Sequence, residues 1–521
     1  MTLDRRAFLT GAVAGTAGAG GVSAAAAASG AQRFTTANAA WQGAYDKALA
    51  VLAGNVRTLP GYPRPVLIEG ASYDGVWMEC GPHEALVHRK FAPEVARDSH
   101  LAFFALQKPD GQLPANIKGS GIGFGQIQMA VPIAATTWEL AQATGDERLL
   151  RTAYDACSRW DAWLLRYRDT LGTGLTEGFC TYDTGQDNSP RWAGFPNRCP
   201  DGDARICPTA PGLPRLCPDL SASTFGARVA LGSMAEALGR PRDAMRWRAA
   251  AEEIRGLILS RLYVAADSGF YDLDANGRRV KIDGDVLTRV CGERVPDQAL
   301  FDRLWARRLG DPKGFWAPWP LPSIALDDPR FVRPIPPNSW GGAAQALTAL
   351  RAPRWMEHYG RAAELATLMQ RWCEAIVRDG GFRQQLDPLS GEFTPGPEGY
   401  SPAALVLVDF TWRLAGVREE AGVLTWTIRP GHPATEGARF RLHTDGGADA
   451  SLRYHPAAAE LAMNGRPVAR ISGGAARLRT DAHGRPLVLE GVSEGVQRVM
   501  VSLPGQPPRR VNLAPDQRVR L

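Results

Sequence analysis

The 521-residue chain carries 60 Lys and Arg against 54 Asp and Glu, a net charge of +6, and no dense basic block stands out. This near balance argues against a nucleic-acid partner. After the N-terminus no apolar run is long enough to cross a bilayer, so we expect no integral membrane segment in the mature protein.

The first 31 residues have the composition of an export signal. Arg5 and Arg6 precede Phe8 and Leu9, and a weakly apolar run of Ala, Gly and Val follows. Paired arginines, a short apolar region and small residues for cleavage are typical of a twin-arginine signal. The alternative, an N-terminal membrane anchor, is disfavoured because the run is short and broken by glycine. We therefore predict a signal over residues 1–31 and a periplasmic or secreted protein.

Helical periodicity dominates residues 32–420. Apolar residues recur at spacings of three and four from Trp247 to Leu262 and from Leu365 to Ile376, which places each set on one face of a helix. Ser223 is a predicted N-cap, and Gly380 follows a predicted helix end. Long Pro- and Gly-rich loops occupy 167–221 and 311–339, and loops of this length usually carry function. Further helices are predicted over 93–107, 126–143, 148–166, 222–238 and 340–351.

From residue 421 the pattern changes to a period of two. Segments such as 424–428, 439–443 and 498–502 alternate apolar and polar residues, and Asn464-Gly465 is one of several turns between them. This alternation predicts a small all-β, β-sandwich-like domain over 421–521. Because no aromatic cluster is evident there, packing against the helical domain is favoured over glycan binding.

Four of the eight cysteines crowd into one loop: Cys180, Cys199, Cys207 and Cys217. In an exported protein such crowding predicts disulfides that fix the loop. Zinc binding is the alternative, but the spacings lack a short Cys-x2-4-Cys pair. The remaining cysteines include Cys157 and Cys373, which fall on apolar helical faces and are expected to be buried thiols.

The most informative segment is Thr184-Gly-Gln-Asp-Asn-Ser-Pro-Arg-Trp192 in the same loop. Asp187 can donate or accept a proton, Asn188 and Arg191 can bind hydroxyl groups, and Trp192 offers a flat apolar face. This set suits a sugar. The segment resembles the catalytic-acid loop of glycoside hydrolase family 63 and its mannosylglycerate-hydrolase relatives, which implies that Asp187 is a general acid. The alternative is an Asp that caps a turn.

Four further segments resemble the same superfamily, in the same order. Residues 73–79, with Trp77, are similar to its first-hairpin W-x-D loop, and Glu79 stands where the family has a sugar-binding Asp. Residues 124–128, which include Gln126, resemble a Q-x-P helix start. Residues 338–342, with Trp340, resemble a G-x-x-W segment, and 386–404, with Tyr400, resemble a late Y-x-P region. Over residues 70–415 the resemblance implies an (α/α)6 barrel of six helical hairpins, with a sugar pocket at the loop end.

The resemblance also implies an inverting reaction, in which one carboxyl group protonates the leaving oxygen and another activates water. Gln384 stands where the family has the Glu base, and an amide cannot take a proton from water at neutral pH. Glu398 is therefore the first candidate for the base and Glu392 the second, with Asp387 and Glu79 as further candidates. The predicted substrate-binding residues are Trp77, Glu79, Gln126, Asn188, Arg191, Trp192, Trp340, Gln384 and Tyr400.

These patterns favour an exported glycoside hydrolase that acts on a small sugar or oligosaccharide. The alternative is a catalytically impaired, sugar-binding relative, which Gln384 supports. A polysaccharide lyase ranks last, because the eight histidines are scattered. We expect no cofactor and no metal, since Asp201-Gly-Asp203 and Asp272-Leu-Asp274 lack a complete calcium loop. The pKa of Asp187 should be raised, with Arg191 directed at substrate or at another acid.

Overall fold

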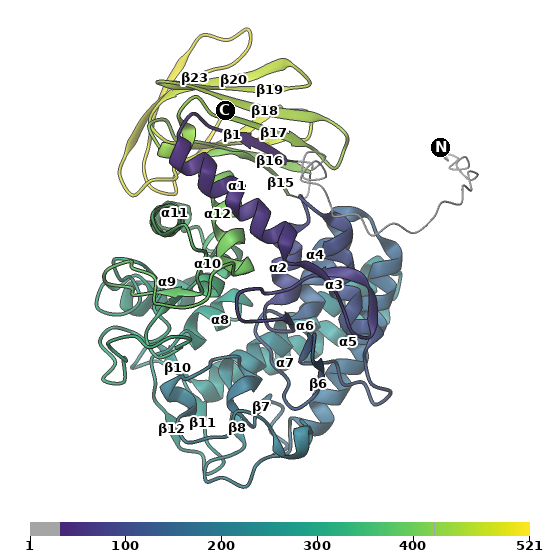
Figure 1. Cartoon of the computed structure of the whole chain (residues 1–521). Coiled ribbons are helices and arrows are strands. Elements are labelled where there is room, and N and C mark those ends of the chain that lie inside the picture. The colour runs from purple at the N-terminus through teal and green to yellow at the C-terminus, as the bar shows by residue number, and fades with distance from the viewer. Residues whose placement is uncertain (1–31, 421) are drawn as a thin grey trace, which may run out of the picture.

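The computed structural model describes residues 32–420 and 422–521. The predicted twin-arginine signal, residues 1–31, lies outside these described residues. In this described part no helix combines the length and apolar character that a bilayer crossing requires. Helices fill the larger end of the molecule, and two antiparallel sheets lie at the other end (Figure 1).

Six helices form a closed ring. Each contacts the next even-numbered helix along the chain, and the last contacts the first, which closes the ring. This order of contacts is the one expected for the inner ring of an (α/α)6 barrel and supports that prediction. The ring helices are α2 (Gly81–His88), α4 (Ile133–Thr144), α6 (Pro218–Ala237), α8 (Val286–Gly292), α10 (Ala346–Met356) and α12 (Ser401–Ala415).

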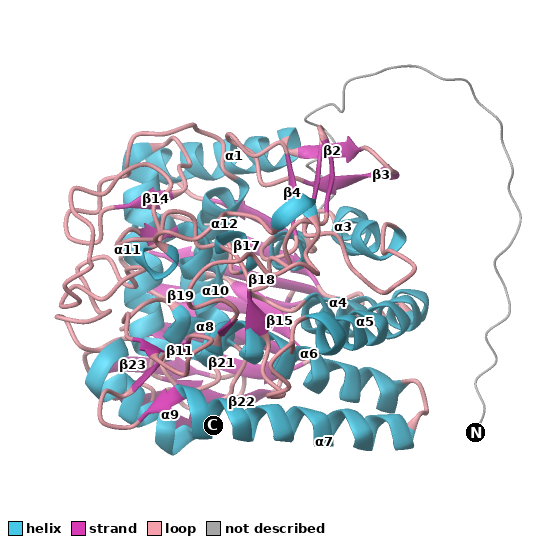
Figure 2. Ribbon diagram, turned by 90° about the horizontal axis from the view of Figure 1, so that it is seen from below, coloured by secondary structure: helices cyan, strands magenta, loops and turns pink. Residues whose placement is uncertain are grey.

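The odd-numbered helices lie outside this ring. In Figure 2, α7 and α6 run side by side, and α5 lies beside α6, in agreement with their contacts. Aromatic stacking links α9 to the segment after α10, because the ring of Phe301 lies 3.8 Å from that of Tyr359. The outer helices are α1 (Ala39–Gly54), α3 (Pro93–Ala105), α5 (Glu147–Tyr167), α7 (Pro241–Leu257), α9 (Gln298–Leu304) and α11 (Ala362–Asp379).

The predicted helices differ from the observed ones mainly at their starts. The helices predicted over 93–107 and 148–166 correspond to α3 and α5, and Gly380 follows α11 at a φ of +67°. The helix predicted from 126 begins only at Ile133, after Pro132, and that predicted from 340 begins at Ala346. Ser223 is not an N-cap, because α6 begins five residues earlier at Pro218, whose fixed φ suits the first helical position.

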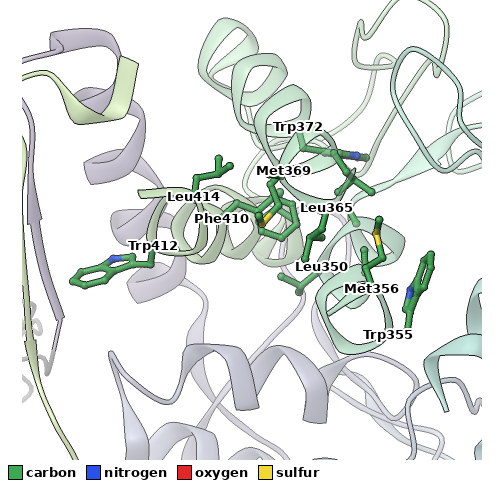
Figure 3. Packing of buried hydrophobic residues seen from close by; sticks show 14 of the residues in the cluster. Leu350, Trp355, Met356, Leu365, Met369, Trp372, Phe410, Trp412 and Leu414 are labelled. Carbon is green, nitrogen blue, oxygen red and sulfur yellow. The ribbon is translucent and has the colours of Figure 1, made fainter. Parts of the chain in front are cut away.

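The apolar faces of three neighbouring helices share one core. Figure 3 shows Leu350, Trp355 and Met356 of α10 packed with side chains of α11 and α12. From those two helices come Leu365, Met369, Trp372, Phe410, Trp412 and Leu414. Cys157 and Cys373 are buried thiols, as predicted. Burial of such side chains contributes about 1.5–3 kcal/mol each and fixes how these helices cross.

A seven-stranded and a five-stranded antiparallel sheet follow the helices. The seven-stranded sheet has the order β1 (Gln32–Thr35), β17 (Arg439–His443), β18 (Asp449–His455), β19 (Ala458–Met463), β20 (Arg466–Gly473), β23 (Gln497–Ser502) and β24 (Arg509–Leu513). The five-stranded sheet has the order β15 (Val417–Glu420), β16 (Val423–Ile428), β21 (Ala476–Asp481), β22 (Pro486–Glu490) and β25 (Arg518–Arg520). Residues alternate between buried and exposed along β17 and β18, as period-two patterns require.

The strand pattern does not begin at residue 421. β15 starts four residues earlier, at Val417, and β1 from the start of the described chain pairs with β17, Phe34 opposite Phe440. The predicted boundaries of 32–420 and 421–521 therefore assign two strands to the helical side. A four-residue strand is too short for periodicity to reveal it in sequence.

Short strands in the loops between the helices pair into small sheets and ribbons. Their strands are β2 (Val56–Leu59) with β3 (Tyr62–Leu67); β4 (Gly75–Trp77), β5 (Asn116–Lys118) and β6 (Gly121–Gly123); β7 (Glu177–Gly178), β8 (Arg215–Leu216), β11 (Asp272–Leu273) and β12 (Arg279–Val280); β9 (Tyr263–Val264) with β10 (Gly269–Phe270); and β13 (Ala344–Gln345) with β14 (Gln385–Leu386). β13 and β14 bring residues 338–345 beside 384–386, on the side of the ring where the inner helices begin.

Glu357, just after α10, links the helices to the sheets. Its Oε1 lies 3.3 Å from Arg413 of α12, 3.2 Å from Arg418 of β15 and 3.5 Å from Arg477 of β21. Burial alone would raise the pKa of Glu357, but the three guanidinium groups more than offset this and lower it from 4.5 to about 2. One carboxylate thus pairs with arginines of both the helical part and the sheets.

We expect Glu357→Gln to destabilise the protein by about 3 kcal/mol, because it removes the anion that the buried Arg418 and Arg477 share with the half-buried Arg413. The carboxylate is ionised in the folded state down to about pH 2, so its stabilisation is complete above pH 4.5 and is lost as the pH falls between these values. Denaturant unfolding at pH 7 and at pH 3.5 measures both effects. Glu253→Gln, at an exposed position of α7, should change neither curve.

Candidate active site

A pocket opens where the inner helices begin. Glu79 lies two residues before α2, Leu347 is in the first turn of α10, and Tyr400 directly precedes α12. The empty volume, open solvent at the mouth included, is about 320 Å³. The lining residues are Glu69, Tyr73, Trp77, Glu79, Gln128, Gly185, Asp187, Asn338, Trp340, Leu347, Gln384 and Tyr400. Three carboxyl groups therefore face one small space.

Asp187 is held in this pocket by its neighbours on another loop. The Asn338 Nδ2 donates a hydrogen bond of 3.0 Å to Asp187 Oδ2, and the backbone N–H of Trp340 donates to the Asp187 carbonyl at 2.9 Å. Burial raises the pKa of Asp187, and the hydrogen bond from Asn338 offsets part of the rise. The direction is the one that a general acid needs.

Glu79 lies directly against the Asp187 loop. Gly185 has a φ of +63°, and a Cβ at that position would lie 1.5 Å from Glu79 Oε2. Only a glycine lets the carboxylate approach the loop this closely. Burial raises the pKa of Glu79 to about 7; Arg351 and Arg289 act in the opposite direction, and Asp187 adds to the rise. Among the described residues no group bonds to Glu79 Oε2.

Glu69 is a third pocket carboxyl group that the sequence did not reveal. It follows the apolar run 66–68, and no motif marks it. The Tyr400 hydroxyl donates a 2.6 Å hydrogen bond to Glu69 Oε1. Burial raises the pKa of Glu69 well above its ordinary value, and the nearby Glu84 carboxylate raises it further. Both effects favour the protonated form of Glu69.

Gln384 lines the pocket and orients Asn338. Its Oε1 accepts a 3.0 Å hydrogen bond from the Tyr73 hydroxyl, and its Nε2 donates at 2.9 Å to Asn338 Oδ1. With its oxygen occupied in this way, Asn338 must turn its Nδ2 toward Asp187. The amide uses both its acceptor and its donor here, which a carboxylate could not do. Tyr73, Asn338 and Gln128 are pocket residues absent from the predicted binding set.

The two first candidates for the base lie outside the pocket. Glu398 is exposed, with Arg383 at 2.7 Å and Lys47 at 4.0 Å from its carboxylate. Glu392 is exposed on the same loop. Asp387 accepts a hydrogen bond from the Leu389 N–H at 2.8 Å and pairs with Arg333 at 3.1 Å. The predictions for Glu398 and Glu392 are therefore wrong in position. Both side chains face solvent, and Glu398 and Asp387 pair with arginines.

Arg191 and Trp192 support the loop and do not face the pocket. Arg191 is buried and points at two other acids, Asp219 and Asp272, with three hydrogen bonds of 2.7–2.8 Å and one of 2.9 Å. Trp192 is 2% exposed, and its Nε1 donates to Thr184 Oγ1 at 2.9 Å. Both side chains point inward, and the buried guanidinium has the carboxylate partners that it needs.

Two predicted amides also lie off the pocket wall. Asn188 is exposed, and its Nδ2 donates to the Asn338 carbonyl at 2.7 Å. Gln126 is buried behind the wall and donates to Gln128 Oε1 at 2.9 Å. Gln128 takes the place in the pocket that was predicted for Gln126, because its φ of +46° turns the chain there. Trp77, Glu79, Trp340, Gln384 and Tyr400 line the pocket as predicted.

All eight cysteines are free thiols in this structure. The Sγ atoms of Cys180 and Cys199 are 3.9 Å apart, beyond bonding distance. Asp183 lies beside them, but its carboxylate accepts hydrogen bonds from Arg168 and from the backbone N–H of Ile127 and Phe179. Because these groups occupy both carboxylate oxygens, Asp183 is a poor third ligand for a metal.

The family of the chain follows from a comparison with known domains. The model of the mannosylglycerate hydrolase MGH1-like glycoside hydrolase domain matches residues 73–412, well over half of the chain. The chain belongs to this glycoside hydrolase family. The fold around Asp187 is therefore that of an enzyme family whose members hydrolyse sugar bonds. No curated protein matches the sequence.

Solved structures share the fold of this glycoside hydrolase at low identity. The family 63 mannosylglycerate hydrolase from Thermus thermophilus, in complex with glucose, is 22% identical over 71% of this chain and 99% of its own, with a TM-score of 0.57. The neutral trehalase from Saccharomyces cerevisiae is 14% identical over 69% and 79%, with a TM-score of 0.53. The family 78 rhamnosidase of a Bacillus species is 12% identical over 82% and 40%, with a TM-score of 0.55.

The contact between Gly185 and Glu79 gives a test of the pocket. In Gly185→Ala the new methyl group would overlap Glu79 Oε2, so the carboxylate must move, and we expect kcat/KM to fall about 100-fold. Gly194→Ala is the matched control: it has a similar φ of +82° in the same loop, but nothing lies within 4 Å of its Cβ. Both variants should lose about 1 kcal/mol of stability from the strained φ. Equal activity in the two variants would contradict the assigned contact.

Proposed function

We propose that the protein is an exported, inverting glycoside hydrolase that cleaves a small sugar or oligosaccharide, with an (α/α)6 barrel as its catalytic domain and an all-β C-terminal domain. The observation that carries the proposal is the convergence of Asp187 and Glu79 on one pocket, in contact through Gly185. Trp77, which is half-buried, offers an apolar face in the same pocket, and such a face suits the C–H side of a sugar ring.

Asp187 is the general acid in this proposal, and Glu79 replaces Glu398 as the base. Glu79 is preferred to Glu69 because a base must lose its proton near neutral pH. Its pKa of about 7 allows this, whereas that of Glu69 is held far above its ordinary value. Glu79 Oε2 also has no hydrogen-bond partner among the described residues, where it lies buried against Gly185. Gln384 then orients, through Asn338, the loop between α5 and α6 that carries Asp187, which we call the acid loop.

The second candidate function is sugar binding without turnover, which the amide at Gln384 favours. An enzyme whose base has been lost would keep the pocket, the stacking face and the raised pKa of Asp187. The two candidates differ in one measurable property, which is whether Glu79 is needed for release of a sugar with an inverted anomeric centre.

We expect Asp187→Asn and Glu79→Gln each to lower kcat about 1,000-fold on glycosides with poor leaving groups, since general acid–base catalysis supplies this order of acceleration. Asp187→Asn should retain turnover of glycosyl fluorides, whose leaving group needs no proton. Glu79→Ala should regain turnover with azide and yield a glycosyl azide of inverted configuration. Glu398→Gln is the matched control and should behave as wild type, because its carboxylate faces solvent and Arg383.

NMR of the first-formed anomer decides between the candidates. Wild-type protein that binds sugars but releases none from a broad panel of glycosides would contradict hydrolysis and favour the binding function. Turnover that survives in Glu79→Gln but not in Asp187→Asn would move the base to another residue.

The pH dependence of kcat/KM follows from the ionisation of Asp187 and Glu79. The active form has Glu79 ionised and Asp187 protonated. Glu79 takes up a proton as the pH falls through about 7, its pKa, so kcat/KM should decline below that pH. It should also decline at high pH, where Asp187 has lost its proton and no acid remains. A profile that stays flat from about pH 6 to about pH 9 would contradict the assignment.

Export predicts a disulfide within the acid loop. Cys180 and Cys199 need to move closer from 3.9 Å, and their oxidation would release two hydrogen atoms to an external disulfide. The mass of protein recovered from the periplasm or medium should therefore lack the residues up to about 31 and two hydrogens. Cys157 and Cys373, buried on separate helices, should stay reduced and serve as internal controls. Export that continues after Arg5 and Arg6 are both changed to Lys would contradict the twin-arginine route.

A further inference from the structure

A second cavity lies inside the helical ring, beneath the catalytic pocket. Leu347 of α10 lines the catalytic pocket, and Arg351, one turn further along the same helix, lines this cavity. Its empty volume is about 380 Å³. The lining residues come from α8, α10 and the segment before α4: Ala130, Val131, Asp285, Thr288, Arg289, Gly292, Glu293, Thr348, Arg351, Arg354 and Trp355.

Three arginines line this cavity, and Arg351 lacks a carboxylate partner. Among the described residues no Asp or Glu oxygen lies within 4 Å of its guanidinium, whose Nη2 donates only to the Glu79 carbonyl at 3.0 Å. Arg289 pairs with Asp285 at 2.9 Å, yet its Nη2 has no partner in the described chain. Both side chains are more than nine-tenths buried. The Glu79 carboxylate favours the charge on Arg351 from beyond contact distance, and a buried guanidinium without a carboxylate in contact is costly.

The acids on the cavity wall do not meet this need. Asp285 is bound to Arg289 and Gln186. Glu293 leans toward α6, where a Cβ on Gly226 would lie 2.1 Å from its Oε2. Arg354 pairs with Glu139 at 2.8 Å and is the partly exposed arginine of the lining.

We propose that this cavity binds a monovalent inorganic anion, chloride in most solutions, between Arg289 and Arg351. Charge-assisted hydrogen bonds from guanidinium groups are the usual partners of such an anion. A multiply charged anion such as phosphate is disfavoured, because Asp285 and Glu293 share the cavity with the arginines.

The bound anion would stabilise the two arginines that support the rear wall of the catalytic pocket. Arg351 holds the Glu79 carbonyl, and Arg289 donates to the Thr184 carbonyl at 2.6 Å and lies 5.1 Å from the ring of Trp340. Both arginines thus support pocket residues or the acid loop. An anion that fixes the two guanidinium groups fixes this rear wall, independently of which reaction the pocket performs.

Crystals of the full chain soaked in bromide test the proposal directly. We expect an anomalous peak within hydrogen-bond distance of Arg289 and Arg351. A cavity that holds only water, with bromide confined to surface positions, would overturn the proposal. This measurement needs no variant and no substrate.

Thermal unfolding gives an independent readout. Replacing gluconate by chloride at constant ionic strength should raise Tm by about 1–2 °C, since a ligand that binds only the native state stabilises it. Arg351→Gln should lose this response, and Arg351→Lys should retain part of it. Arg303→Gln, at an exposed position of α9, should respond as wild type. Equal Tm values in chloride and gluconate, or stabilisation by phosphate alone, would contradict a monovalent-anion site.

Discussion

Arg191 anchors the acid loop to the helical ring, and the geometry of the pocket depends on it. Its guanidinium donates to Asp219, at the start of α6, and to Asp272 of β11. A fifth bond, of 2.8 Å, reaches the side-chain oxygen of Gln186, the residue before Asp187. Arg289 continues the network from Asp219 to Asp285, to which Gln186 also donates. The charges are buried yet mutually satisfied, and such a network favours one loop conformation because removal of any member leaves an uncompensated charge.

This anchoring explains the electrostatics of the acid. Asp219 and Asp272 neutralise the charge of Arg191, so Arg191 does not lower the pKa of Asp187. The side chain of Asp187 instead meets burial and a neutral amide, and its pKa rises. The same segment turns at Gly185, and the absence of a side chain there lets Glu79 approach. The spacing of Gly185, Asp187 and Arg191 within one loop therefore brings the Glu79 and Asp187 carboxyl groups and the anchor together.

The family, the ring of helices and six pocket residues, Asp187 among them, can be predicted from the sequence, but contacts between distant segments cannot. The chemistry of Arg191 and Trp192 suits a sugar, yet only the fold reveals that Asp219 and Asp272 reach Arg191 first. Glu398 stands close to Tyr400 in sequence, but Arg383 and Lys47 hold it at the surface. Glu69 could not be found, since a single Glu after a strand carries no pattern. The pairing of β1 with β17, about 400 positions away, is equally invisible to local periodicity.

The amide at Gln384 and the carboxylate at Glu79 are best understood together. If the base stood at position 384, a carboxylate there would repel Asn338 Oδ1 and would leave Asn338 free to turn its amide away from Asp187. The amide instead accepts from Tyr73 and donates to Asn338, so the chain Tyr73–Gln384–Asn338–Asp187 has one consistent direction of donation. The pocket has a second carboxyl group because Glu79 reaches the loop of Asp187 at Gly185. The amide at Gln384 is thus compatible with two carboxyl groups in the pocket as long as Gly185 remains a glycine.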